Sequence, residues 1–277
     1  MLSLGLDLSG SPHAVVTDDR GKVVGEGAGG DAGAAVHAAV AKRAPEVAGV
    51  ASPSDASDVP VTGIRIIARA TPGAAAVAAE AWVGAARGVR HAVCLHVGET
   101  VFAGLLLDGR PWGGAHNRAG QAAWLAINPV ERQDYRKLGS LAAEVSSKGI
   151  ARRLSWRIQA GDRSRVLDAV GGSLDAITST DVFDGARGGD GVAISVVRET
   201  AKYIGMAVAT FAAALDPEVV VVSGGVAVAD LMLEAVRQEC ARRLPPEAMT
   251  DMRVEFSELG PNAIAIGAAR LAQLAAA

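Results

Sequence analysis

Short apolar segments alternate with longer alanine-rich segments along most of the chain. Apolar and polar positions alternate in residues 2–8, 13–18 and 23–27, which the turn sequences SGSP and DRGK separate, and this predicts a three-stranded meander. Later apolar runs predict strands at 47–50, 64–68, 93–97, 103–107, 217–223 and 253–257. Helical patterns occupy 31–42, 73–88, 119–127, most of 129–190, 193–215, 228–243 and 262–277. Strands that alternate with helices after a meander predict an α/β protein with two lobes.

The stretch 93–127 is the most informative part of this pattern. A strand reaches Gly98, a second strand follows, and Asp108-Gly109 makes a tight turn, which is a strong hairpin signal. A loop rich in Gly, His and Asn then leads into a predicted helix at 119–127. Glycine-bearing turns between strands let backbone N–H groups approach a phosphate closely, so the turn at Gly98 is a candidate phosphate site.

The composition narrows the class of protein. The chain has 277 residues, of which 50% are hydrophobic, and a formal net charge of −3, so it has no electrostatic reason to bind nucleic acid or an anionic membrane. No apolar run approaches the roughly 20 residues that span a bilayer. The N-terminal MLSLGLDLSG lacks the basic region of a signal peptide and contains Asp7, which predicts a cytoplasmic protein. Cys94 and Cys240 are too few and too far apart for a metal cluster or a disulfide framework.

Several segments together resemble the ROK family of repressors, open reading frames and sugar kinases. The segments that carry the resemblance are LGLDLSGSPHAVVTDDRGKVVGEG, GAAAVAAEAWVGAARG, GLLLDGRPWGGAHNRAGQ, DVFDGARGGDGVAISVV, ALDPEVVVVSGGV and PNAIAIGAARLA. The resemblance implies a two-lobed actin-like ATPase (sugar kinase/RNase H-like) fold, with an ATP cleft between the lobes and the sugar at its base. It implies one lobe from residues 1–90 plus 261–277 and a second from 91–260. It also implies a homodimer.

The sequence departs from the family pattern at the catalytic base. In the family, an aspartate in an N-D-A-N motif takes the proton from the sugar hydroxyl, and the matching pair here is Thr71-Pro72. Proline has no group that accepts a proton, and no aspartate lies anywhere between residues 63 and 107. Loss of a general base typically costs about 10²- to 10⁴-fold in rate. The sequence therefore predicts that Pro72 leaves the site without its usual base.

The second phosphate turn also departs from the pattern. The family's G-T-G-x-G-x-G falls on residues 98–104, where Gly98 remains but Thr100 and Phe102 replace glycines and Glu99 replaces the threonine. A carboxylate about 4 Å from a phosphate charge is repelled by roughly 4 kcal/mol at an effective dielectric near 20, although a magnesium ion would offset part of this. We therefore expect poor ATP binding at this turn.

The nucleotide-binding elements that remain lie elsewhere. In the first hairpin Asp7 and Gly10 are retained and Ser11 keeps a hydroxyl, so Asp7 is either a metal ligand or a hydrogen-bonded turn residue. Gly224 and Gly225 follow a buried strand, where they would either admit a purine or simply form a turn.

The predicted sugar and zinc sites are changed as well. The family's A-G-E-x-G-H motif reads here as residues 119–124, so Gln121 replaces a sugar-binding glutamate and Trp124 replaces a zinc-binding histidine. Ala142 stands where the resemblance places another sugar-binding glutamate, and residues 131–144 contain none of the family's zinc cysteines. We therefore expect no zinc or other metal site. The candidate ligand-binding residues are Asn117, Gln121, Trp124 and Trp112.

Three functions remain open from the sequence. The first is a ROK-fold protein that binds a small molecule or a partner without phosphorylating it. The second is a true kinase of a sugar or sugar-like molecule, with Mg-ATP as cofactor and a base supplied by Asp7, the substrate or a neighbour. The third is different chemistry in the same cleft, for which His96, His116 and Glu99 are candidates. Direct DNA binding is not expected, because the first hairpin begins at Leu2 and leaves no room for a winged helix.

Overall fold

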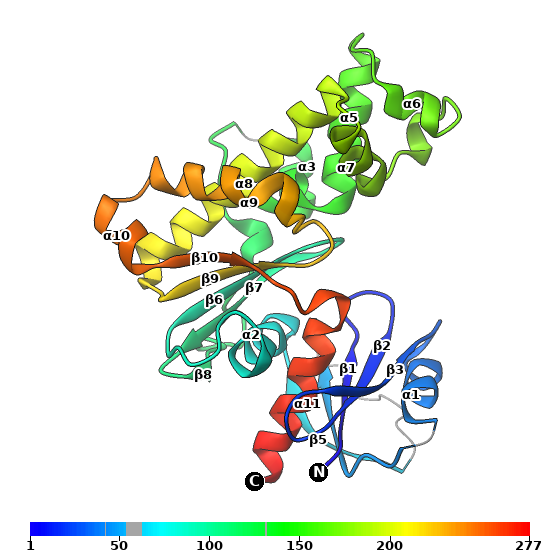
Figure 1. Cartoon of the computed structure of the whole chain (residues 1–277), viewed down its shortest axis with the longest axis vertical. Coiled ribbons are helices and arrows are strands. Elements are labelled where there is room, and N and C mark those ends of the chain that lie inside the picture. The colour runs from blue at the N-terminus through cyan, green and yellow to red at the C-terminus, as the bar shows by residue number, and fades with distance from the viewer. Residues whose placement is uncertain (42, 54–62, 131) are drawn as a thin grey trace.

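The computed structural model describes residues 1–41, 43–53, 63–130 and 132–277. The first of its two five-stranded sheets has the order β3-β2-β1-β4-β5. Its strands are β1 (Ser3–Asp7), β2 (His13–Thr17), β3 (Val23–Ala28), β4 (Val47–Ala51) and β5 (Arg65–Ala70). The first three strands are antiparallel, whereas β4 and β5 run parallel to β1. Helix α1 (Ala32–Val40), which Asp31 caps, covers one face of this sheet (Figure 1).

The second sheet has the order β10-β9-β6-β7-β8. Its strands are β6 (Ala92–Val97), β7 (Val101–Leu107), β8 (Arg110–Pro111), β9 (Val219–Ser223) and β10 (Arg253–Phe256). The central strands are buried on both faces, because alternate residues of β6 and β9 contribute to two different hydrophobic clusters. This double burial explains why the sequence shows continuous apolar runs there rather than alternation.

Helices cover the outer face of the second sheet (Figure 1). The helices on this side of the sheet are α3 (Gln133–Leu138), α4 (Ser140–Val145), α5 (Ser147–Gln159), α6 (Arg165–Ala169), α7 (Ser179–Arg187), α8 (Gly191–Leu215), α9 (Ala229–Ala241) and α10 (Pro246–Asp251). Among them, α5 and α7 pack on α8, and α6 packs on α7. Three short 3₁₀ turns lie at Ala122–Trp124, Leu174–Ala176 and Gly260–Asn262. No helix among the described residues combines the length and apolarity that crossing a bilayer requires.

Helices α2 (Pro72–Val83) and α11 (Ala263–Ala276) pack against each other between the two sheets. Helix α11 packs on β1 and β4 of the first sheet, and α2 packs on β6 and β7 of the second. The two helix backbones nearly touch, because a Cβ atom on Gly267 would lie 1.7 Å from the Ala75 carbonyl oxygen. A Cβ atom on Gly104 of β7 would likewise lie 1.9 Å from the Gly73 carbonyl oxygen. Glycine at both positions therefore sets how close the sheets and helices come.

The element pattern predicted from the sequence is confirmed except at two helices. The expected helix at 119–127 is wrong, since only Ala122–Trp124 form a 3₁₀ turn. Gly120 has φ +83° and its carbonyl accepts the N–H of Ala103 in β7. The segment is therefore hydrogen-bonded to β7 instead of forming a helix. The helix expected to end at Gly88 ends at Gly84, because the Glu80 side chain accepts the Ala85 N–H. The predicted loop at 52–60 lies mostly outside the described residues, and the lobe boundary at residue 90 remains a prediction.

We predict that Gly267→Ala lowers the free energy of unfolding by about 3 kcal/mol, because its methyl group would overlap the α2 backbone rather than a movable side chain. Gly191→Ala is the matched control. Gly191 opens helix α8, and a Cβ atom there would meet nothing within 4 Å. Urea unfolding followed by circular dichroism measures both variants, and equal stabilities would contradict the prediction.

Candidate functional site

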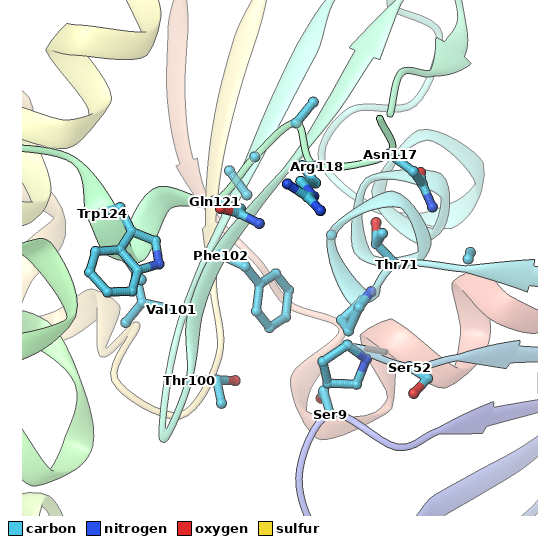
Figure 2. Close-up of a pocket in the computed structure, with 18 of the residues that line it drawn as sticks. Ser9, Ser52, Thr71, Thr100, Val101, Phe102, Asn117, Arg118, Gln121 and Trp124 are labelled. Carbon is cyan, nitrogen blue, oxygen red and sulfur yellow. The ribbon is translucent and has the colours of Figure 1, made fainter. Parts of the chain in front are cut away.

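A cavity of about 560 Å³ opens between the two sheets (Figure 2). One wall comes from the first sheet and the start of α2, through the carboxyl ends of β4 and β5, Ser9 and residues 71–73. The other wall comes from the start of β7 and from the segment 116–124. Because β1, β4 and β5 are parallel, their carboxyl ends meet at one edge of the sheet, where α/β proteins commonly bind ligands.

The first wall places Pro72 in the cavity lining. The Thr71 hydroxyl caps α2 by accepting the Ala74 N–H at 3.2 Å, and Pro72 occupies the first helical turn. Proline suits this position, since its ring fixes a helical φ angle and its missing N–H has no helical partner to lose. The position at which the sequence predicted a lost base therefore faces the cavity. No described lining residue is an aspartate or glutamate.

The second wall is a loop that hydrogen-bonds to itself and to β7. The Ala119 N–H donates to the Gly113 carbonyl at 2.9 Å, and the Ala103 N–H donates to the Gly120 carbonyl at 2.7 Å. This arrangement presents Asn117, Arg118 and Gln121 along the cavity, with Trp124 at one side (Figure 2). Of the four predicted ligand-binding residues, Asn117, Gln121 and Trp124 thus line the cavity. Trp112 is exposed and is not among the lining residues.

The predicted second phosphate turn joins β6 to β7. Thr100 lines the cavity, whereas Gly98 is buried and Glu99 is exposed outside the lining. The His96 ring stacks on Phe102 with ring centroids 4.5 Å apart, and its Nδ1 lies 3.4 Å from the Ser223 hydroxyl. Gly224 has φ +94°, and a Cβ atom there would lie 3.0 Å from the His96 ring. The imidazole thus fills the space between the two glycine turns, and burial lowers its pKa to about 4.

The predicted first phosphate hairpin joins β1 to β2. Asp7 is buried and its carboxylate accepts the Ser9 N–H at 2.8 Å, so it acts as a hydrogen-bonded turn residue. Burial raises the pKa of Asp7, and the bonds from Ser9 and the nearby His13 oppose that shift. Ser9 lines the cavity, but Asp7, Gly10 and Ser11 do not. Within the described residues, no three His, Cys, Asp or Glu side chains are placed to hold a metal ion together.

Comparison with known proteins identifies the family to which this architecture belongs. A family model described as the ROK family matches residues 65–275. The chain belongs to the ROK family. A glucokinase of Halalkalibacterium halodurans is 30% identical over 196 residues, which are 68% of this chain and 58% of that protein. The N-acetylglucosamine repressor of Escherichia coli O157:H7 is 26% identical over 199 residues, or 71% of this chain and 47% of the repressor. The alignments thus span about half the length of these relatives.

Solved ROK structures confirm the fold. A ROK-family glucokinase of Streptomyces griseus, determined with glucose and AMPPNP, superposes with a TM-score of 0.86 at 22% identity, covering 99% of this chain and 100% of that one. A ROK hexokinase of Thermus thermophilus superposes with a TM-score of 0.80 at 25% identity over the whole of both chains. The two-lobed α/β architecture predicted from the ROK resemblance is therefore confirmed.

The residues suggested for replacement chemistry in this ROK cleft do not come together. Only His116 lines the cavity, while the His96 ring stacks on Phe102 and Glu99 is exposed outside the described lining. No hydrogen bond or ion pair joins any two of these three in the described part of the chain. Acid–base catalysis requires such groups to lie within hydrogen-bond reach, so this arrangement does not meet the requirement.

A network of charged side chains connects α3 and α4 to α5. Helices α3 and α4 lie in the segment in which the family resemblance places zinc cysteines. Glu144 of α4 is 1% exposed and accepts a hydrogen bond from the Tyr135 hydroxyl at 2.5 Å. Two guanidinium groups reach the same carboxylate, from Arg132 at 3.1 Å and from Arg153 at 3.7 Å. Burial and the bond to Glu144 raise the pKa of Tyr135 to about 12. The buried carboxylate therefore connects α3, α4 and α5.

Aromatic contacts extend this network toward the surface. The guanidinium of Arg132 lies 5.3 Å from the Trp156 ring and that of Arg152 lies 4.7 Å from it. Both arginines also form ion pairs with Asp134 at 2.9 Å. Arg152, Arg153 and Trp156, all on α5, thus organise this corner of the lobe.

Sequence reasoning overlooked several residues of the cavity. Chief among them are the cationic Arg69 and Arg118 and the aromatic Phe102 as a wall residue. Arg118 stands between Asn117 and Ala119, inside the very segment that the sequence singled out. The neighbouring residues were selected because they match positions of the family motif. The positive charge of Arg118 was visible in the sequence, but a comparison with motif positions does not use it.

We predict that Glu144→Gln lowers the free energy of unfolding by about 3 kcal/mol, because Arg132 and the buried Arg153 both lose the charge of the one buried carboxylate that they share. Glu199→Gln provides the comparison. Glu199 pairs with the same Arg153 at 3.2 Å, but its side chain is 50% exposed, so its loss should cost less than about 1 kcal/mol. Urea titrations compare the two variants, and a Glu144→Gln protein as stable as Glu199→Gln would count against the network.

We predict that His96 makes the protein sensitive to acid. Its folded pKa of about 4 lies below the ordinary value of 6.5, so the unfolded chain takes up the proton first as the pH falls. Its contribution to stability is complete above pH 6.5 and is lost as the pH falls toward 4, by on the order of 2 kcal/mol at pH 4.5.

The measurement is the difference in unfolding free energy between pH 7 and pH 4.5 for the wild type and His96→Asn. The variant should lose about 2 kcal/mol less than the wild type over this range, since asparagine does not titrate. Equal losses would show that His96 does not titrate differently in the two states.

Proposed function

We propose that this ROK protein binds a sugar or sugar-derived small molecule in the cavity between its sheets without efficiently phosphorylating it. The observation that carries the proposal is Pro72, which lines the cavity where the family resemblance places the catalytic aspartate. No described lining residue supplies a carboxylate in its place.

The lining supports binding of a polyhydroxylated ligand. The amides of Asn117 and Gln121 each donate and accept hydrogen bonds, and hydroxyl groups of Ser9, Thr71 and Thr100 add further partners. The flat face of Trp124 supplies an apolar surface beside these polar groups. Ligand sites commonly combine an apolar wall with a few convergent polar groups, and this cavity has the volume of such a site.

The phosphate turns support the absence of efficient transfer. Kinase catalysis depends on holding and neutralising the transferred phosphoryl group. Here the stacked rings of His96 and Phe102 occupy the space between the two glycine turns, and a neutral imidazole supplies no positive charge at pH 7. Glu99 adds a negative charge at the same turn.

The alternative of an active sugar kinase also has specific support. The glucokinase of Halalkalibacterium halodurans is 30% identical, and the glucokinase of Streptomyces griseus shares the fold closely. This alternative requires tight Mg-ATP binding and a base from outside the observed cavity lining. Asp7, the candidate named from sequence, is buried in its turn and does not line the cavity. A homodimer remains an expectation from the family resemblance, and a cytoplasmic location remains an expectation from the sequence.

We expect titration calorimetry to detect one-to-one binding of at least one sugar or sugar derivative, while sugar adds nothing to the rate of ADP release from Mg-ATP. The panel comprises glucose, mannose, N-acetylglucosamine, N-acetylmannosamine and their acidic derivatives. Sugar-dependent ADP release by the wild type would establish the kinase alternative instead. Absence of binding by every member would overturn the proposed binding function.

A pair of variants separates the base from the phosphate turns. Pro72→Asp places a carboxylate in the first turn of α2, where acidic residues are favourable, and Pro72→Ala is its matched control. If Mg-ATP binds, Pro72→Asp should exceed Pro72→Ala in sugar-dependent ADP release by about 10²-fold. Equal release with bound Mg-ATP would mean that the missing carboxylate does not limit transfer.

A further inference from the structure

We propose that the ligand of this cavity is anionic, namely a monosaccharide that carries a phosphate or a carboxylate group. The inference deepens the proposed binding function, on which its sugar component rests. Its charge component rests on the cavity alone.

The charges around the cavity are all of one sign in the described lining. Arg69 and Arg118 line it, and no aspartate or glutamate is present there. The chain as a whole contains 30 acidic and 27 Lys and Arg residues. The described lining is therefore more positively charged than the chain as a whole, and this favours binding of an anion.

Arg118 is the most available of these groups. Its side chain is exposed and forms no hydrogen bond or ion pair with the rest of the described chain. Figure 2 shows it beside Gln121 and across from Thr71, on a loop that two backbone hydrogen bonds hold in place. An arginine side chain suits phosphate and carboxylate, because its planar guanidinium donates two parallel hydrogen bonds to either group.

The opposite wall adds a second source of positive potential. Helix α2 has 12 residues, its first turn lines the cavity, and that turn contains no acidic residue. The aligned peptide dipoles place a partial positive charge at this end, which favours a nearby anion. Arg69 belongs to this wall as well, and since it makes other contacts the proposal uses only its charge.

The rest of the lining indicates a sugar rather than a bare anion. Asn117 and Gln121 offer amides, and Trp124 and Phe102 offer aromatic surfaces. A small inorganic anion uses neither the aromatic wall nor a cavity of about 560 Å³. A pyranose ring that carries one charged substituent uses both parts of the site.

The test is titration calorimetry with glucose, glucose 6-phosphate, glucuronate and inorganic phosphate. We expect glucose 6-phosphate or glucuronate to bind at least about 10-fold more tightly than glucose, with an affinity that falls as salt is added. The stronger of the two identifies whether the site takes a phosphate or a carboxylate. Inorganic phosphate should bind more weakly than the charged sugar, because it does not use the sugar-binding wall.

Arg118→Gln should weaken binding of the charged sugar roughly 10- to 100-fold, and should weaken glucose binding by a smaller factor. Arg110→Gln is the matched control, since Arg110 is an exposed arginine on β8 outside the cavity lining. Both variants should keep the wild-type melting temperature, because neither side chain has a partner among the described residues.

The possible outcomes separate the two proposals. Glucose that binds as tightly as its charged derivatives would overturn the anionic ligand and leave the sugar-binding function standing. Inorganic phosphate that binds as tightly as every charged sugar, with Arg118-dependent affinity, would keep the anion site and overturn the sugar component. Charged sugars that bind equally well to Arg118→Gln and the wild type would overturn the proposal that this cavity binds the anionic group through Arg118. Failure of all four probes to bind would overturn the inference itself.

Discussion

The close contact between helices α2 and α11 is the constraint on which the rest of the structure depends. Gly267 brings α11 against the α2 backbone at Ala75, and the contact of Gly104 with Gly73 brings β7 against the start of the same helix. Each sheet packs on one of the two helices, so this contact fixes the sheets relative to each other. It also fixes the first turn of α2, which forms one wall of the cavity. The cavity is therefore shaped by the core and not only by its surface loops.

This arrangement explains how a site can keep its shape while its chemistry changes. Proline at residue 72 preserves the helix start, because the first turn of a helix needs no N–H from that residue and accepts its fixed φ angle. It removes the carboxylate without disturbing the glycine contact one residue later. Across the cavity, Gln121 keeps an amide on a segment whose position depends on the hydrogen bond between Ala103 and Gly120. Backbone geometry at these positions thus depends on interactions that do not involve the side chains of Pro72 and Gln121.

The sequence predicted most of the fold because its signals were local. Runs of β-branched residues, turn sequences and the Thr71-Pro72 start of α2 depend on neighbouring residues, and the structure has elements at those places. The predicted helix at 119–127 was wrong, and the candidates His96 and Glu99 do not meet, because distant contacts decide both positions. Gly120 follows β7 through a tertiary hydrogen bond, and His96 is held by Phe102 and Ser223. Gln121 and Trp124, which the sequence named as candidates, line the cavity, whereas Arg118 becomes apparent only when the lining is assembled.

The proposed lack of efficient transfer and the proposed anionic ligand both rest on the absence of a carboxylate from the described cavity lining. A carboxylate at residue 72 would face any phosphate or carboxylate in the cavity, and at about 4 Å the repulsion is roughly 4 kcal/mol at an effective dielectric near 20. With Pro72 in its place, the positive end of α2 and the guanidinium of Arg118 meet no opposing charge in the described lining. In the proposed function, proline at residue 72 thus supplies no base for transfer and leaves the electrostatic condition that favours a charged sugar.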